Sequence, residues 1–258
     1  MSSKISRQKE HFNNIANQYY IARQNPNSLR YKELLWKYIF QFFPSTKSIS
    51  VLEPMCGYGE GEYTIKSCYC QSVDYTGFDF SERLIEIIKK NTPNKHVFVQ
   101  DVTTFIPEDK YDLIWLIGGL HHVPDYSFAV LKNLCKGLNN NSLLVNFEPT
   151  HSNAITKKIR SHIYRSNHIF DETTERDFSV NELNNMYKNA GLEIVCQFYP
   201  GLLSYCLYYN PDAFPRLASI NPVILNSLFA LEKPFYRTSI AKFFSFATLT
   251  VLKKCLKT

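Results

Sequence analysis

The chain has 258 residues, of which 45% are hydrophobic and 20% charged, and this balance predicts a globular protein rather than a disordered one. Its net charge of +6 comes from 29 basic and 23 acidic residues without the basic stripe of a nucleic-acid-binding protein. Seven cysteines without a CxxC pair, no signal-peptide core and no apolar run of ~20 residues predict a cytoplasmic protein without membrane insertion.

Two helices are predicted before the first strand. Phe12, Ile15 and Tyr19 recur at helical spacing, and residues 25–28 (Asn-Pro-Asn-Ser) break the helix that they define. A second amphipathic helix follows and ends at Pro44. We expect these two helices to cap a ligand site in the core.

From residue 49 onward the pattern alternates between strands and helices. The predicted strands span residues 49–53, 72–78, 96–100, 111–117, 142–147, 192–198 and 243–252. Repeated β-α units imply a doubly wound α/β fold with a seven-stranded, mostly parallel sheet covered on both faces. We expect a single domain over 1–258, with a cap (1–45), a core (46–198), a helical insertion (199–242) and a last strand with its tail (243–258).

Polar residues or glycines follow the first five predicted strands. In an open α/β sheet, ligands bind beyond the carboxyl ends of the strands. The residues at these ends are Glu53, Asp79, Asp101, Gly118-Gly119 and Glu148. Each is weak evidence alone, but in register they are typical of a binding site.

The glycine-rich turn after the first strand does not suit a dinucleotide. Its sequence, Gly57-Tyr-Gly59-Glu-Gly61-Glu62, lacks the final glycine of the dinucleotide fingerprint. Glu53 comes before the glycines, where it would repel a pyrophosphate and attract an ammonium group. The turn therefore favours a ligand with an adenosine end, a positive end and no phosphates.

Five segments resemble motifs of the class I S-adenosylmethionine-dependent methyltransferases that act on small molecules, and the resemblance extends from Tyr19 to Lys254. The segments are VLEPMCGYGEG (51–61), YTGFDFSERL (75–84), FVQDV (98–102), YDLIWLIGGLHHVPD (111–125) and DFSVNELNNMYKNAGLEIV (177–195). The resemblance implies a Rossmann-like methyltransferase fold and S-adenosylmethionine as cofactor. Met55 departs from it, because the family usually has glycine there.

The same resemblance implies a role for each cofactor-binding position. At the methionine portion of the cofactor, it places Glu53 near the amino group, Gly57 and Gly59 at the sulfonium end, and the Ile117 backbone along the chain. It places Asp79 and the adjacent Phe80 at the ribose, and Asp101 and Val102 at the adenine. Tyr20 and Arg23, with Tyr19, would lie over the pocket.

Three residues are candidates for catalysis: His121, His122 and Glu148. Imidazole titrates near neutral pH, so either histidine can act as a base, and the alternative for each is a structural hydrogen bond to the backbone. Glu148 and His151 follow the fifth strand and could bind the acceptor. These four residues could also ligate a divalent ion, but no ligand spacing supports this, so no metal is expected.

The predicted activity is transfer of a methyl group to an oxygen or nitrogen of a small molecule. The aromatic stretch 199–242 is either a lid or substrate pocket, or a helical cover or dimer face. Alternatives are a non-methylating enzyme such as a cyclase, for which Met55 is the only hint, and a non-catalytic cofactor-binding module. Protein or RNA methylation also stays open, although no Asn-Pro-Pro-Tyr type of motif follows the fourth strand.

Overall fold

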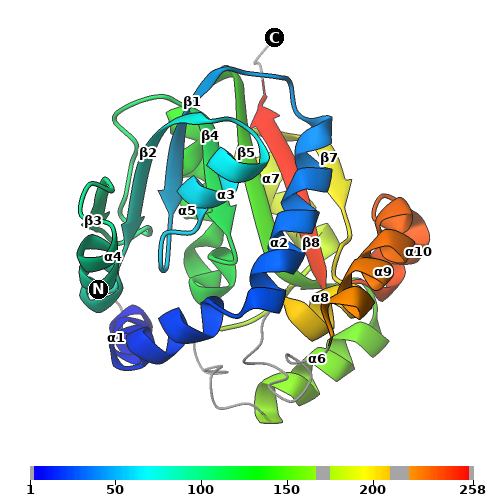
Figure 1. The fold of residues 1–258 in the computed structure, drawn as a ribbon. Helices are drawn as coiled ribbons and strands as arrows, with labels where there is room; N and C mark the ends of the chain where they lie inside the picture. The colour runs from blue at the N-terminus through cyan, green and yellow to red at the C-terminus, as the bar shows by residue number, and fades with distance from the viewer. Residues whose placement is uncertain (1–2, 167–174, 210–220, 256–258) are drawn as a thin grey trace.

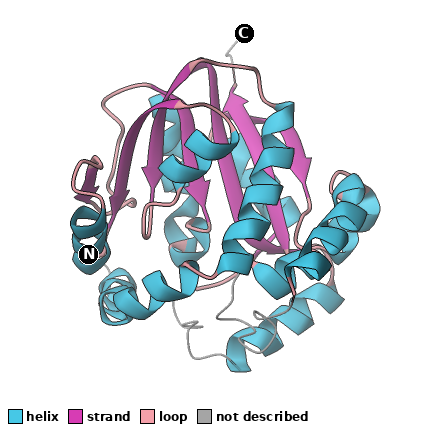
Figure 2. Cartoon of the chain, in the orientation of Figure 1, coloured by secondary structure: helices cyan, strands magenta, loops and turns pink. Residues whose placement is uncertain are grey.

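A computed structural model describes residues 3–166, 175–209 and 221–255 as one twisted sheet with helices on both faces (Figures 1 and 2). Across the sheet the strands are β3 (Val97–Val99), β2 (Ser72–Asp79), β1 (Ser48–Pro54), β4 (Tyr111–Ile117), β5 (Leu138–His151), β8 (Ala247–Lys254) and β7 (Leu192–Phe198). A short strand, β6 (Phe178–Ser179), pairs with the end of β5 off this path.

The sheet is mostly parallel, as predicted. Neighbouring strands from β3 to β5 run parallel, whereas β8 is antiparallel to both β5 and β7. The chain moves outward from β1 through β2 to β3 and then crosses back to β4 on the other side of β1. This reversal leaves a crevice at the carboxyl ends of β1 and β4, which is where open α/β sheets bind ligands.

Ten α-helices surround the sheet within the described residues. They are α1 (Ser3–Arg23), α2 (Pro26–Ile39), α3 (Gly61–Cys68), α4 (Glu82–Asn91), α5 (Ser127–Leu134), α6 (Ala154–Ser166), α7 (Val180–Asn189), α8 (Leu203–Tyr208), α9 (Pro222–Glu232) and α10 (Ser239–Phe244). Local sequence explains several boundaries: the Asn25 side chain caps α2 ahead of Pro26, and Ser179 and Glu182 form the predicted capping box of α7. No helix of the described part is long and apolar enough to cross a membrane.

Two apolar clusters cover the two faces of the sheet. Alternate residues of β4 enter different clusters: Trp115 packs with Trp36 of α2, whereas Ile114 and Leu116 pack with the cluster that contains Leu131 of α5. This alternation follows from the two-residue period of a strand. Both faces of the central strands are therefore buried, and the polar side chains of the site are confined to the strand ends.

The predicted bounds of β5 were wrong. The strand begins at Leu138, and Asn139 to Asn141, predicted as a turn, lie within it. The register between β4 and β5 shifts, with Tyr111 opposite Leu138 but Leu113 opposite Leu143. The asparagines therefore form a bulge, a local irregularity that their turn-forming preference did not distinguish from a reversal of the chain.

Two further elements differ from the prediction. Helix α6 was not predicted, although Asn153 accepts hydrogen bonds from the Ile155 and Thr156 N–H groups at its start. The last strand begins at Ala247 rather than at residue 243, because Thr238 caps a short helix that includes Phe243.

A helical insertion before the last strand is confirmed by α8, α9 and α10, while 210–220 lie outside the described residues. The division of the chain into cap, core and insertion stays a prediction.

Candidate active site

One cavity lies at the carboxyl ends of β1, β2, β4 and β5 and is covered by α1. Ten of the residues given a cofactor-binding or catalytic role from the sequence line it: Tyr19, Arg23, Glu53, Gly57, Asp79, Phe80, Ile117, His121, His122 and Glu148. Four others do not: Tyr20, Gly59, Asp101 and Val102. The cavity therefore brings the predicted catalytic residues together with most, but not all, of the predicted cofactor-binding residues.

Glu53 holds the glycine-rich turn against β1. Its Oε2 atom accepts hydrogen bonds from the Gly61 N–H at 3.1 Å and from the Tyr75 hydroxyl. A Cβ at Gly61 would lie 2.6 Å from the same oxygen, so only glycine fits at the first residue of α3. Burial raises the pKa of Glu53 to about 7. The sequence showed the three glycines of the turn but not that Gly61 packs on Glu53.

Three positive φ angles shape this turn: +55° at Met55, +55° at Gly57 and +75° at Gly59. Met55 is the one residue other than glycine with a positive φ in the described part of the chain. Its side chain lies over Gly119, where an added Cβ would be only 2.8 Å from the Met55 Sδ atom. The methionine thus has a packing role between the turn and the loop after β4, and it needs glycine at position 119.

Asp79 is arranged to accept further hydrogen bonds. The residue is 5% exposed. Oδ2 accepts from the Gly57 N–H and Oδ1 from the Ser81 N–H, both at 3.0 Å. Each carboxylate oxygen can accept about two hydrogen bonds, so each retains capacity for a ligand hydroxyl. Burial raises the pKa of Asp79 to about 6. This donor and acceptor chemistry fits the ribose of S-adenosylmethionine.

The four predicted residues outside the cavity lining have other partners. Asp101 Oδ1 accepts from both the Thr103 N–H and the Thr103 hydroxyl at 2.8 Å, and the Val102 side chain is buried. The Gly59 carbonyl accepts from Lys95 at 2.6 Å, and the Tyr20 ring packs edge-on against Tyr58. The predicted contacts of Asp101 and Val102 with adenine stay a prediction.

Helices α1 and α2 enclose the cavity from the side of the glycine turn. The Tyr19 ring lies beside Gly57, and the Arg23 guanidinium lies 4.5 Å from the centre of that ring. From α2, the buried Lys32 donates hydrogen bonds to the Tyr58 hydroxyl at 2.9 Å and to Glu60 at 2.5 Å. Lys32 and Glu60 both line the cavity, and neither was singled out from the sequence.

Glu148 organises the loop after β4. The side chain is 1% exposed, and Oε1 accepts from the Gly119 and Leu120 N–H groups at 3.0 and 2.8 Å. Its Oε2 lies 2.8 Å from Nδ1 of His121. Burial and the neighbouring His122 lower the pKa of His121 in spite of this carboxylate. A neutral His121 donates through Nδ1 to Glu148, which leaves Nε2 as the ring nitrogen able to accept a proton.

A second histidine–carboxylate pair lies beside the first. Nδ1 of His122 lies 3.1 Å from Oε1 of Glu175 and 3.0 Å from Nε2 of Gln8. Burial alone would lower the pKa of His122, but Glu175 outweighs burial and raises it. Glu175 and Gln8 were missed by sequence reasoning, because no motif links positions 167 residues apart.

Donor atoms of His121, His122 and Glu175 lie within 4.8 Å of one another, close enough to hold a metal ion. The second oxygen of Glu175, Oε2, is buried and has no hydrogen-bond partner. This set differs from the four residues considered from the sequence, since Glu175 takes the place of Glu148 and His151. Both histidines already contact carboxylates through Nδ1, so hydrogen bonding alone also accounts for the arrangement.

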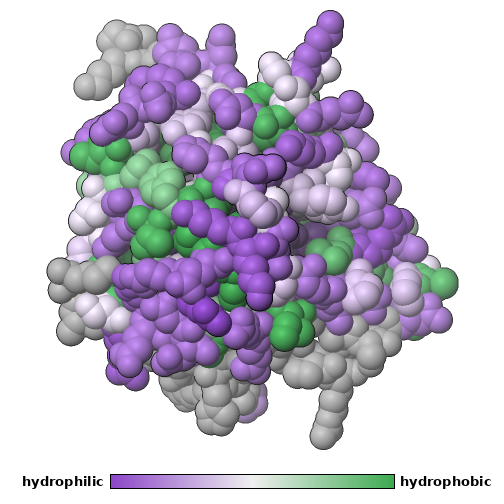
Figure 3. Space-filling view, turned by 60° about the vertical axis from the view of Figure 1, so that its left-hand side comes forward, coloured by the Kyte–Doolittle hydropathy of each residue, from purple (hydrophilic) through white to green (hydrophobic). Residues whose placement is uncertain are grey.

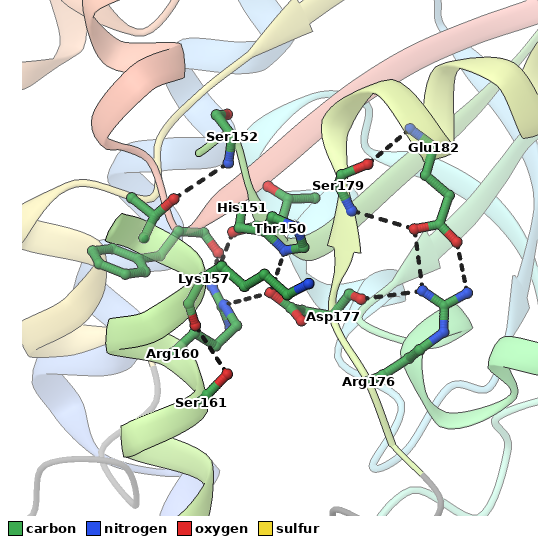
Figure 4. A network of polar contacts seen from close by, with 12 residues as sticks. Thr150, His151, Ser152, Lys157, Arg160, Ser161, Arg176, Asp177, Ser179 and Glu182 are labelled. Carbon is green, nitrogen blue, oxygen red and sulfur yellow. Dashed lines mark hydrogen bonds and ion pairs between the residues drawn. The ribbon is translucent and has the colours of Figure 1, made fainter. Parts of the chain in front are cut away.

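His151 does not line the cavity and has a different setting (Figure 4). Its Nδ1 lies 2.7 Å from Oδ2 of Asp177, and Arg160 approaches the same oxygen at 3.5 Å. Arg160 also donates to the Thr150 carbonyl at 3.4 Å. These contacts tie α6 to the end of β5 and to the segment before β6, so His151 is a structural residue in this geometry.

A family model described as a methyltransferase domain matches residues 28–197, which is more than half of the chain. The chain belongs to this methyltransferase family. The methyltransferase is 30% identical over 109 residues to the demethylmenaquinone methyltransferase of Lactococcus lactis subsp. lactis, covering 40% of this chain and 43% of that relative. It is 25% identical over 152 residues to the Staphylococcus aureus enzyme of the same name, and this alignment covers 57% of this chain and 62% of that relative. The chain thus aligns with less than two thirds of either relative.

Solved methyltransferase structures have the same fold. The methyltransferase superposes on a Brevibacillus brevis O-methyltransferase in complex with S-adenosyl-L-homocysteine with a TM-score of 0.57 at 16% identity, covering 86% of this chain and 72% of that one. For a Mycobacterium tuberculosis cyclopropane synthase the TM-score is 0.60 and the sequence identity 15%, with 85% of this chain and 83% of that one covered. For coclaurine N-methyltransferase the TM-score is 0.59 and the sequence identity 15%, with 85% of this chain and 69% of that one covered. These structures share the fold of this chain, in agreement with its membership of the methyltransferase family.

Proposed function

We propose that this methyltransferase methylates an oxygen or nitrogen atom of a small aromatic molecule. The observation that carries the proposal is the shared cavity, which Asp79 and the His121–Glu148 pair both line. Aromatic side chains, among them Trp115 and Phe147, line the same cavity. Apolar walls with a few placed polar groups are typical of small-molecule sites, and aromatic rings pack well against a planar ligand.

The cofactor would lie between the glycine turn and α1. Asp79 would accept from the ribose hydroxyls, the turn at Gly57 would pass under the methionine portion, and Tyr19 and Arg23 would cover it. When bound, the cofactor supplies a methyl group on a positive sulfonium, ready for in-line displacement. The protein then has to align the acceptor and exclude water, and alignment alone can account for much of the rate.

His121 is our candidate for the general base. Its lowered pKa keeps the imidazole neutral near pH 7, the form that accepts a proton. Glu148 fixes the orientation of the ring and would stabilise the imidazolium formed when Nε2 takes the acceptor proton. His122, held by Glu175, has the opposite shift and is better suited to orient the acceptor through a hydrogen bond.

Turnover on defined acceptors tests this proposal. Purified protein with methyl-labelled cofactor would be incubated with a panel of phenols, catechols and aromatic amines. Demethylmenaquinone, for which both relatives are named, would be tested beside them. It accepts a methyl group on a ring carbon, so its methylation would contradict transfer to oxygen or nitrogen. We expect a labelled small-molecule product that disappears in the His121→Asn variant. Label that enters only protein or RNA from a cell extract would contradict a small-molecule acceptor.

A chelator separates the base from a metal. If His121 acts as a base, EDTA leaves turnover unchanged and added Zn²⁺ or Mn²⁺ does not increase it. Loss of activity in EDTA with recovery in one of these ions would instead assign His121, His122 and Glu175 to a metal ion. The contact of Met55 with Gly119 gives this residue a structural explanation, and no second function is proposed.

A further inference from the structure

Helix α9 is apolar on two sides. Leu225 and Phe229 point inward and are buried, whereas Val223 and Leu231 are 67% and 70% exposed. At 100° per residue, Val223, Ile224 and Leu231 fall on one outer stripe of the helix. A helix needs only one apolar stripe to pack on its own domain, so the outer stripe of α9 has no role in the fold of the described residues.

Helices α6 and α10 repeat this arrangement. Ile240 and Phe244 are exposed at a spacing of four residues on α10, while Ala241 between them is buried. Ile155 and Ile159 are exposed at the same spacing on α6. The Asn153 side chain donates to the Phe243 carbonyl at 2.6 Å, which joins the start of α6 to α10. We call the exposed apolar side chains of α6, α9 and α10 the apolar face.

The three helices of the apolar face lie at one corner of the molecule (Figure 1, lower right). The side of the molecule that turns forward in Figure 3, which carries β3 and α4, is by contrast mostly hydrophilic. Single exposed apolar residues need no explanation, but three adjoining helices with outer apolar stripes do.

Basic residues accompany the apolar face. Lys157 and Lys158 on α6 and Lys233 after α9 are exposed, and Lys242 on α10 is half-buried. Among the described side chains of 153–162 and 221–246 the one carboxylate is Glu232, which accepts from the Ser204 N–H at 3.2 Å. The face therefore combines apolar and positively charged groups without an opposing free carboxylate in those ranges.

We propose that the apolar face binds the surface of an anionic phospholipid bilayer, with α6, α9 and α10 lying along the interface. Apolar side chains of such helices enter the boundary between headgroups and acyl chains, and lysines contact the lipid phosphates. A second copy of the chain fits less well, because a two-fold interface through this face would set its lysines against one another.

One of these helices, α6, forms part of the cavity wall, together with the neighbouring α8. Arg160 of α6 lines the cavity, as do Tyr205 of α8 and Tyr209 just after it. A molecule dissolved in the bilayer would therefore meet the protein beside its active site. The proposal of lipid binding is argued from the apolar and basic side chains of the face, and it does not depend on which molecule is methylated.

Vesicle flotation tests the proposal with the full chain. We expect the protein to float with phosphatidylglycerol–phosphatidylcholine vesicles at low salt, but not with pure phosphatidylcholine vesicles or at high salt. Lys157→Gln with Lys158→Gln should weaken binding about fivefold for each charge removed. Ile240→Ser with Phe244→Ser should weaken it more than tenfold. The matched control is Val99→Ser with Ile106→Ser, which replaces side chains 43% and 50% exposed near the β3 edge and should bind like the parent.

Three results would overturn the proposal. The first is a parent protein that stays unbound with anionic vesicles at low salt. The second is equal loss of binding in the control and in the face variants. The third is a dimer, detected by light scattering, that the face variants dissociate, which would assign the face to a second copy. Thermal melting checks that each variant is folded, and the lysine variants alone decide the matter if Ile240→Ser with Phe244→Ser unfolds.

Discussion

The two halves of the proposed active site, one for the cofactor and one for the acceptor, are built in different ways. The cofactor half comes from one continuous stretch, in which β1, the glycine turn and β2 supply Glu53, Gly57 and Asp79. The acceptor half is assembled from distant segments, because Gln8, His121 and Glu175 come from α1, the loop after β4 and the segment before β6. In the first half, side chains accept from nearby backbone N–H groups. In the second, side chains mainly position other side chains.

The difference explains how one fold can keep its cofactor and change its acceptor. Backbone N–H groups that point at Asp79 are set by the turn and tolerate changes elsewhere. The His122–Glu175 pair depends on three elements meeting at one point, so a shift of α1 would alter it. Variants in the acceptor half should therefore change turnover without changing cofactor affinity, and variants in the cofactor half should do the reverse.

The largest expected effect comes from the acceptor half. His121→Asn can keep a hydrogen bond to Glu148 but removes the base, so kcat should fall about 10³-fold. Affinity for S-adenosylhomocysteine, measured by calorimetry, should stay unchanged. His151→Asn is the control, because this histidine bonds to Asp177 outside the cavity and should leave turnover near the parent value. Equal losses in the two variants would remove His121 from catalysis.

The reverse pattern is expected at Asp79. Asp79→Asn replaces a charged acceptor by an amide that can accept from only one ribose hydroxyl, so cofactor affinity should fall about 10²-fold. At saturating cofactor, kcat should change much less. Asp101→Asn serves as the comparison and should alter affinity no more than about twofold, since Asp101 lies outside the cavity lining. A larger loss at position 101 would restore its predicted contact with adenine.

Cofactor binding should depend on pH in a direction set by Asp79. The pKa of this carboxyl is raised to about 6, so the form that accepts from ribose predominates above pH 6 and is lost below it. Affinity should fall about tenfold between pH 7 and pH 5, and this dependence should be smaller in Asp79→Asn. Calorimetric titration across this range measures both. Binding that strengthens toward pH 5 would contradict an ionised Asp79 in the complex.

The smallest effect probes the contact between the two halves. Met55→Ala loses packing on Gly119 and keeps the strained φ, whereas Met55→Gly loses the packing but relieves the strain. The glycine variant should therefore be more stable than the alanine variant by about 1 kcal/mol in urea denaturation, the reverse of their usual order in ordered structure. Gly119→Ala should be less destabilising in the Met55→Gly background than in the parent, because the atom that it would strike is gone. Additive effects would contradict this packing role.

How much could be predicted differs between regions for physical reasons. The bounds of β4 and β7 and the capping box of α7 are local patterns, since hydrophobic period and cap chemistry act over a few residues. The bulge at Asn139 to Asn141 depends on pairing with β4, so its local sequence was ambiguous. The start of α6 did have a local signal in Asn153, which the sequence reasoning did not use. The hydrogen bond from the Gly61 N–H to Glu53 lies between these cases, because the residues were visible in the motif but their contact was not.

The sequence by itself determined the family and the order of the strand-end residues from Glu53 to Glu148, because these depend on short motifs that any copy of the fold repeats. Tertiary structure alone decided that Glu175 and Gln8 face His122, that Met55 packs on Gly119 and that α6, α9 and α10 share an exposed apolar face. Those contacts join residues far apart in the chain, and only the packing of helices on the sheet brings them within hydrogen-bonding or van der Waals distance.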